Sequence, residues 1–274
     1  MQFVTLNNGL EMPQLGFGVW QVKDEEAAPA VLKALQTGYR SIDTAAVYGN
    51  ERGVGKAIKE SGIPREELFI TTKVWNSEQG YDKTLKAFDE SLEKLGLEYV
   101  DLYLIHWPVP SDDLYVDTYK ALEKLYEDGR VKAIGVCNFD IDHLQRLLDE
   151  CDVKPVLNQI ECHPHLVQKE LKAFCKEHDI YIEAWSPLMS GGIVLGNAVV
   201  KAIAEKHGKT PAQVILRWHL QNDSIVIPKS VTPSRIEENF DVFDFELTQE
   251  EMDQITALDS GERTGPVPAE FNRK

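Results

Sequence analysis

Residues 100–138 read VDLYLIHWPVPSDDLYVDTYKALEKLYEDGRVKAIGVCN, and this stretch predicts a strand, a helix and a second strand. The segments VDLYLIH (100–106) and VKAIGVCN (131–138) are mostly apolar and rich in β-branched residues, as buried strands are. Residues 114–128 carry apolar side chains at helical spacing, and Gly129 follows as a stop signal. A unit of this kind is typical of a parallel sheet covered by helices.

The same alternation extends in both directions along the chain. Eight strands are expected, at 15–19, 39–43, 68–73, 100–106, 131–138, 156–161, 180–185 and 224–229. Helices are expected at 24–37, 51–61, 82–95, 114–128, 140–150, 168–178, 210–221 and 233–239, with two extra helices at 196–207 and 249–258. Before the first unit, Asn7-Asn8-Gly9 predicts a β-hairpin, because Asn-Gly supplies the positive φ of a tight turn.

Eight strand–helix units after a hairpin predict a (β/α)8 TIM barrel that occupies residues 1–274 as a single domain. A doubly wound sheet is the alternative. If it bound a dinucleotide, it would carry G-x-G-x-x-G after its first strand, and the nearest match, residues 16–21, lacks the third glycine.

Local signals mark the helix ends. Asp24 and Asp140 are expected N-caps, and Gly38 and Gly62 are expected C-terminal stops. Pro29 falls inside the first helical pattern, where it predicts either a helix start or a kink.

Composition narrows the class of protein. The chain is 43% apolar and 27% charged, as ordinary globular proteins are, and its net charge is −16. Such an acidic surface repels nucleic acid and anionic membranes, so neither is an expected partner. Four scattered cysteines without a C-x-x-C pair favour reduced thiols. No signal peptide or long apolar segment is evident, and we expect a cytoplasmic protein.

Functional groups stand where the predicted strands end. These residues are Asp43, Lys73, His106, Asn138, Gln159, Trp185 and Lys229, with Trp20 after the first strand. In a closed parallel barrel, the carboxyl ends of the strands converge on the rim that holds the active site. Polar residues also end strands simply because loops begin there, but Lys and Trp are poor residues for starting a loop.

The chemistry of this set suits carbonyl reduction. Tyr48 lies in the loop after Asp43, within reach of Lys73 and His106 if the barrel closes. A neighbouring ammonium lowers the pKa of a phenol, and a paired Asp would hold that ammonium in place. A His can donate a hydrogen bond to a carbonyl oxygen, so the group forms a proton donor aimed at developing negative charge.

Seven motifs follow one another along the chain: GYRSIDTAAVYGNE (38–51), FITTKVW (69–75), DLYLIHWP (101–108), GVCNF (135–139), NQIECHP (158–164), EAWSPL (183–188) and IPKSVTPSRIEEN (227–239). Together they resemble the aldo-keto reductases, and the chain is similar to the bacterial branch that includes 2,5-diketo-D-gluconate reductases and to microbial prostaglandin F synthases. The resemblance implies a monomeric NADPH-dependent enzyme that reduces small carbonyl compounds, such as methylglyoxal or diketo sugar acids, to alcohols.

The resemblance also implies roles for individual residues. Tyr48 would be the general acid, Lys73 would lower its pKa, Asp43 would anchor Lys73, and His106 would orient the carbonyl. Trp20, Trp75 and Trp107 would line the substrate mouth beside Tyr48 and His106. The expected NADPH-binding set is Trp20, Asp43, Asn138, Gln159, Trp185, Ser186, Leu188, Lys229, Ser230, Arg235, Glu238 and Asn239.

Within that set, Trp185 would stack on the nicotinamide, while Asn138 and Gln159 would hold its carboxamide. Lys229, Ser230 and Arg235 would take the 2′-phosphate, and Glu238 and Asn239 would face the adenine. The residues support the phosphate assignment independently, because Thr232-Pro233 predicts a helix N-terminus, where free N–H groups attract anions.

Two features depart from the family pattern. Cys137 stands where Ser is common, and a thiol is the weaker hydrogen-bond donor. The short C-terminal tail leaves fewer residues to close over a substrate.

Three other functions remain as alternatives. His163 and His165, with Asp43 and His106, suggest a metallo-hydrolase, but Tyr48 and Lys73 are poor zinc ligands, so no metal is expected. Glu161 and Glu183 could form a glycosidase pair, although buried, paired carboxylates are the favoured interpretation. A non-catalytic member of the same fold is the third.

Overall fold

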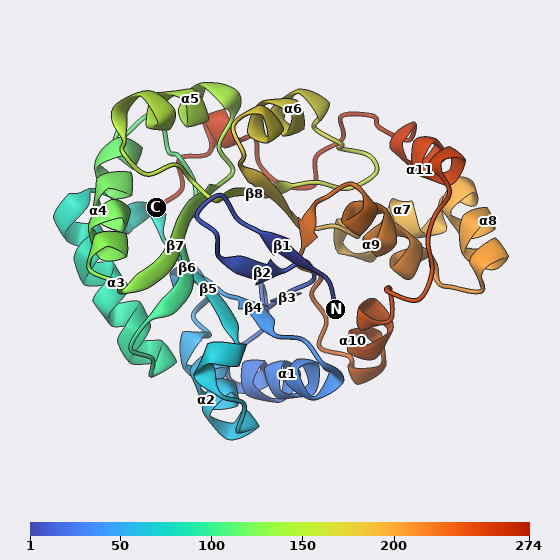
Figure 1. Cartoon of the computed structure of the whole chain (residues 1–274), viewed down its shortest axis with the longest axis horizontal. Helices are drawn as coiled ribbons and strands as arrows, with labels where there is room; N and C mark the ends of the chain where they lie inside the picture. The colour runs from blue at the N-terminus through green and yellow to red at the C-terminus, as the bar shows by residue number, and fades with distance from the viewer.

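The computed structural model describes residues 1–274 and contains a parallel eight-stranded sheet (Figure 1). The strands follow sequence order: β3 (Phe17–Gly18), β4 (Ser41–Asp43), β5 (Phe69–Val74), β6 (Val100–Ile105), β7 (Val131–Cys137), β8 (Leu157–Glu161), β9 (Tyr181–Trp185) and β10 (Ile225–Val226).

Backbone hydrogen bonds join the first strand to the last. The Gly16 N–H donates to the Val226 carbonyl at 2.9 Å, and the Val226 N–H donates to the Gln14 carbonyl at 3.0 Å. Leu15 forms a parallel bridge with Val226. The sheet is therefore closed, and the (β/α)8 barrel expected from the sequence is confirmed.

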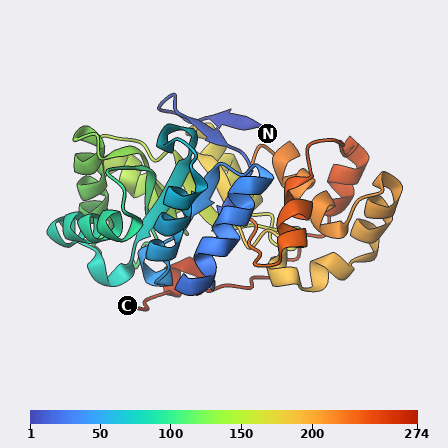
Figure 2. The same ribbon diagram turned by 90° about the horizontal axis from the view of Figure 1, so that it is seen from below.

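Helices surround the sheet on its outer side (Figures 1 and 2). They are α1 (Asp24–Thr37), α2 (Glu51–Ser61), α3 (Tyr81–Leu95), α4 (Tyr115–Glu127), α5 (Ile141–Glu150), α6 (Lys169–Glu177), α7 (Ile193–Gly196), α8 (Ala198–His207), α9 (Pro211–Gln221), α10 (Pro233–Phe240) and α11 (Gln249–Thr256). No helix is long and apolar enough to cross a membrane. The two expected extra helices are α8 and α11, whereas α7 was not predicted.

The N-terminal hairpin of β1 (Phe3–Thr5) and β2 (Glu11–Pro13) covers one end of the barrel (Figure 2). Its Asn7 amide donates to the carbonyls of Pro155 and Asp179, which precede β8 and β9. Leu6 and Met12 are buried against interior strand residues. The hairpin therefore closes the amino end of the barrel and leaves the carboxyl end for the site.

Some boundary predictions were wrong for physical reasons. Lys23, not Asp24, is the N-cap of α1, because the Asp24 carboxylate accepts the Gly53 N–H of α2 at 2.7 Å. Helix α1 continues through Pro29 rather than starting there. Strand β10 is shorter than expected, because Pro228 follows closely and has no N–H to donate to a neighbouring strand.

A buried carboxylate with two partly exposed cations links three strands near the amino end of the barrel. The Asp101 carboxylate on β6 accepts from Arg65 Nη2 at 2.7 Å, from Lys132 Nζ at 3.2 Å and from the Ile70 N–H at 2.9 Å. Both oxygens are thus satisfied in a side chain that is 4% exposed.

Asp101→Ala is expected to lower the free energy of unfolding by about 2 kcal/mol, because it leaves the buried Ile70 N–H and the Arg65 guanidinium without their acceptor. Chemical denaturation measures this loss. The matched control is Asp89→Ala, which removes the exposed Asp89–Arg130 pair and should change stability by less than about 1 kcal/mol. Equal effects in the two variants would contradict this assignment.

Candidate active site

A buried ion pair lies at the carboxyl end of the barrel. Lys73 Nζ, at the end of β5, donates to Asp43 Oδ1 at 2.6 Å and to the Thr44 carbonyl at 2.9 Å. Burial alone would lower the pKa of Lys73, but Asp43 and Tyr48 outweigh it, so that pKa lies above its ordinary value. The side chain therefore holds a full positive charge inside the barrel.

The Tyr48 phenol lies beside this charge. Tyr48 is the last residue of a short 3-10 helix, η1 (Ala46–Tyr48), that follows β4. Lys73 Nζ lies 5.2 Å from the centroid of the Tyr48 ring. Burial raises the pKa of Tyr48 above its ordinary value, and the Lys73 charge opposes that rise. The expected influence of Lys73 is present, but burial exceeds it, so the phenol is held protonated.

His106 completes the group. Its ring centroid lies 5.6 Å from that of Tyr48 and 5.2 Å from that of Trp75. Burial, and then the Lys73 charge, hold the pKa of His106 well below its ordinary value, so the imidazole is neutral. Nδ1 is buried without a partner, which leaves Nε2 as the nitrogen that can reach a ligand.

Two amides and an indole from the next strands join the site. Asn138, which has a φ of +60°, donates to the His106 carbonyl at 3.0 Å and accepts from Trp185 Nε1 at 2.8 Å. Gln159 Nε2 donates to Asp43 Oδ2 at 2.8 Å. The strand-end residues from β4 to β9 are thus brought together, as the sequence predicts.

Aromatic side chains cluster beside His106 at the carboxyl end of the barrel. Trp75 and Trp107 both pack on Phe271, with ring centroids 6.3 Å and 4.2 Å away. Asn76 holds this tail by donating to the Arg273 carbonyl at 2.7 Å. Phe271 was not predicted from the sequence, because its only signal there is that it is an aromatic residue near the end of the chain. Trp20 does not share this packing and is 52% exposed.

The residues that the sequence predicts to bind the 2′-phosphate lie at the start of α10. Thr232 is the N-cap and Pro233 the first helical residue, as expected. Lys229 and Arg235 are exposed on either side, and Ser230 Oγ accepts the Thr232 N–H at 3.1 Å.

The remaining expected cofactor residues have separate surroundings. Glu238 accepts a hydrogen bond from Thr210 Oγ1 at 2.8 Å, and Asn239 is buried beside it in α10. After β9, Ser186 has a φ of +50°, and Leu188 packs against the core.

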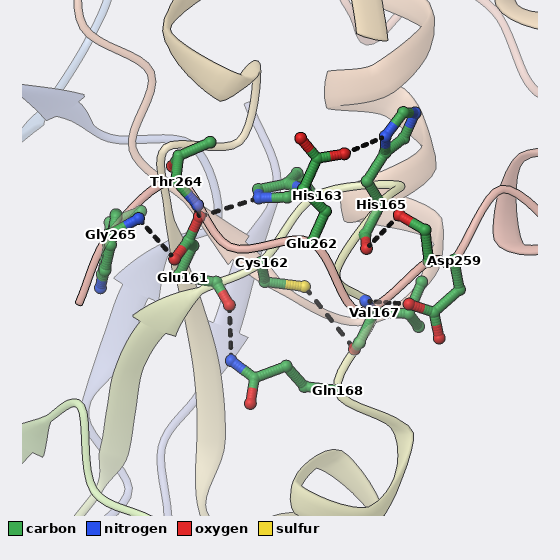
Figure 3. Close-up of polar contacts among 12 residues, drawn as sticks. Glu161, Cys162, His163, His165, Val167, Gln168, Asp259, Glu262, Thr264 and Gly265 are labelled. Atoms are coloured by element: carbon green, nitrogen blue, oxygen red, sulfur yellow. Dashed lines mark hydrogen bonds and ion pairs between the residues drawn. The ribbon is translucent and has the colours of Figure 1, made fainter. Parts of the chain in front are cut away.

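Residues 259–265, which we call the strap, cross the carboxyl end of β8 (Figure 3). Glu161 Oε1 accepts from the N–H and Oγ1 of Thr264, both at 2.6 Å, and lies 3.0 Å from His163 Nε2. Glu161 Oε2 accepts the Gly265 N–H at 3.1 Å. These contacts give Glu161 and His163 a structural role. That role was favoured from the sequence over a metal site for His163 and over a glycosidase pair for Glu161.

The strap also touches Trp185. A Cβ atom on Gly265 would lie 2.4 Å from Trp185 Cη2, so only glycine lets the backbone approach the indole this closely. Glu161 therefore fixes the strap, and the strap limits where the Trp185 ring can move.

The fold and site define a barrel oxidoreductase, and comparison with known proteins agrees. The sequence profile of the Aldo/keto reductase family matches residues 14–260, and the chain belongs to this family. It is an NADPH-dependent reductase of aldehydes and ketones, which confirms the resemblance and the cofactor expected from the sequence.

Relatives cover nearly the whole chain. Glyoxal reductase of Bacillus subtilis is 59% identical over 98% of this chain and 96% of its own. Methylglyoxal reductase DkgA of Escherichia coli is 55% identical over 98% and 97%. An aldo/keto reductase structure from Brucella melitensis has a TM-score of 0.91 at 60% identity, covering 94% of this chain and 99% of its own. A mutant of Gox0644 in complex with NADPH has a TM-score of 0.94 at 48% identity, covering 98% of both chains.

The strap contact depends on the charge of Glu161. Burial alone would raise the pKa of Glu161, but hydrogen bonds from His163, Thr264 and Gly265 lower it to about 2. Because an unfolded Glu has a pKa of about 4.3, the stabilisation is complete above that pH and is lost as the pH falls toward 2.

Glu161→Gln is expected to reduce the hydrogen-exchange protection of the Thr264 and Gly265 amides on the order of tenfold at neutral pH. In the wild type the same loss should occur only as the pH falls from about 4 toward 2. Exchange followed by NMR tests both. Glu262→Gln, on the exposed side of the strap, is the matched control. Unchanged protection in Glu161→Gln would refute the anchor.

Proposed function

We propose that Tyr48 is the general acid of this reductase and that small α-dicarbonyl compounds, such as methylglyoxal, are its substrates. The observation that carries the proposal is the buried Lys73 ammonium, paired at 2.6 Å with Asp43 and 5.2 Å from the Tyr48 ring. A cation fixed there stabilises the phenolate that remains when Tyr48 gives up its proton.

The donor groups of the barrel rim fit NADPH. Trp185 offers a flat ring, and the Asn138 and Gln159 amides offer donors and acceptors suited to a carboxamide. Lys229 and Arg235 flank the N-terminus of α10, where a 2′-phosphate would meet free N–H groups and two positive charges. When bound, NADPH supplies the hydride that forms the new C–H bond.

The residues of this chain would carry out the rest of the reaction. Neutral His106 donates from Nε2 to the substrate carbonyl oxygen and orients it. Tyr48 transfers its proton to the same oxygen as negative charge develops there, which completes the alcohol. Asp43 keeps Lys73 in place through both states of the phenol.

The walls of the mouth support a small substrate with a flat or apolar face. Trp75, Trp107 and Phe271 pack together, and the Trp75 ring lies 5.2 Å from that of His106, so they offer a flat apolar surface beside the proposed carbonyl site. The relatives named glyoxal reductase and methylglyoxal reductase support the same substrate class.

We also propose that the enzyme is a single-domain monomer of the cytoplasm that binds neither nucleic acid nor membranes. The net charge of −16 supports this, because it repels polyanions and like copies. The four cysteines are free thiols, as is usual in a reducing compartment.

Tyr48→Phe is expected to lower kcat for methylglyoxal reduction at least about 100-fold, because it removes the proton donor, while NADPH still binds. NADPH oxidation and fluorescence titration measure the two quantities. Tyr81→Phe, at an exposed tyrosine, is the control. If Tyr48→Phe reduced the substrate at the wild-type rate, the proton-donor assignment would be wrong.

Arg235→Ala is expected to weaken NADPH on the order of tenfold or more and to leave NADH nearly unchanged, because only NADPH carries the 2′-phosphate. Titration with each nucleotide checks this result. Arg52→Ala, which removes an exposed cation on α2, should affect neither. A parallel loss for both nucleotides would argue against a phosphate contact.

A further inference from the structure

Glu183 is a buried carboxyl group that the proposed reaction does not use. It lies on β9 beside Gln159 of β8 and is fully shielded from solvent. Its Oε2 accepts from Gln159 Nε2 at 2.8 Å, whereas its Oε1 has no hydrogen-bond partner. A charged carboxylate in such a place would leave one oxygen both desolvated and unpaired.

The charges around Glu183 favour its neutral form. The titratable groups that act on it are Asp43 and Lys73, and the Cys137 thiol is also near. Lys73 is already paired with Asp43, so a second carboxylate would have no counter-ion. Burial, followed by the Asp43 charge, raises the pKa of Glu183.

Gln159 bridges the two carboxyl groups. Its single amide nitrogen donates to Asp43 Oδ2 and to Glu183 Oε2, each at 2.8 Å, so both N–H bonds are occupied. The amide carbonyl must then point the other way, where Oε1 accepts a weak hydrogen bond from the Cys137 thiol, with Sγ at 3.8 Å, and keeps a second lone pair for another donor. Rotating the amide by half a turn would bring its oxygen against the Asp43 carboxylate, which is repulsive.

We propose that Glu183 is a positioning residue: its neutral carboxyl group, together with Asp43, orients Gln159 so that the amide oxygen accepts from the nicotinamide carboxamide. This inference rests on the proposed cofactor site. It adds that the orientation is set by a carboxyl group that does not itself touch the cofactor. Without Glu183, one N–H of Gln159 would be buried without a partner, and Asp43 alone would remain to orient the amide.

The test compares two variants and two ligands. Glu183→Gln keeps a neutral acceptor of the same shape, whereas Glu183→Leu keeps the volume but removes the acceptor. Calorimetry would measure the binding of NADPH and of adenosine 2′,5′-bisphosphate, which has the phosphate but no nicotinamide.

Glu183→Leu is expected to weaken NADPH on the order of tenfold, while adenosine 2′,5′-bisphosphate binds as it does to the wild type. Glu183→Gln should bind both ligands within about threefold of the wild type. The proposal is overturned if Glu183→Leu binds NADPH normally, if it loses both ligands in parallel, or if Glu183→Gln weakens NADPH tenfold. The measurement on Glu183→Gln can still overturn the proposal if the Glu183→Leu variant does not fold.

Gln159→Leu separates this inference from the proposed function. If Gln159→Leu binds NADPH normally, the carboxamide site itself is wrong. If Gln159→Leu weakens NADPH but Glu183→Leu does not, the site stands and the role of Glu183 falls.

Discussion

The charge of Lys73, held inside the barrel by Asp43, is the interaction on which the rest of the site depends. An isolated ammonium would not stay ionised in this interior, and the carboxylate at 2.6 Å keeps it so. The same Asp43 also accepts from Gln159, so one side chain links the proton-donating half of the site to its amide half. Removing either partner would leave an unpaired buried charge, which is far less favourable than removing both.

The barrel interior divides into two layers with different tasks. Near the hairpin it is filled by apolar side chains such as Leu6, Met12 and Leu102, which supply packing energy. Toward the carboxyl end, Lys73, Gln159 and Glu183 replace them. The polar layer is thus built on a rigid apolar base. At the carboxyl end the polar layer is bounded by the strap, which contacts Glu161 and Trp185 (Figure 3), and by the tail that carries Phe271.

Most of this architecture could be predicted from the sequence, because strand and helix periodicity are local and strand ends in a parallel barrel share one rim. Helix α2 was predicted to its residue limits, and the strand-end set from Asp43 to Trp185 does meet. What could not be predicted depends on distances between remote segments. The approach of Gly265 to Trp185 and the packing of Phe271 on Trp107 are of this kind. The net direction of the Tyr48 pKa is another, because burial and a nearby charge oppose each other and only the folded environment decides between them.

The two chain ends lie on opposite faces of the barrel (Figure 2). The last residues pack against the loop that follows β6, where Ser111 Oγ lies 2.7 Å from Asn272 Oδ1 and Lys274 Nζ lies 3.0 Å from Asp112. An affinity tag or fusion partner attached after Lys274 would therefore begin close to the cluster of Trp75, Trp107 and Phe271. The same addition before Met1 would extend from the opposite side. Tags for screening, immobilisation or display are therefore best joined through the amino terminus, away from the proposed site.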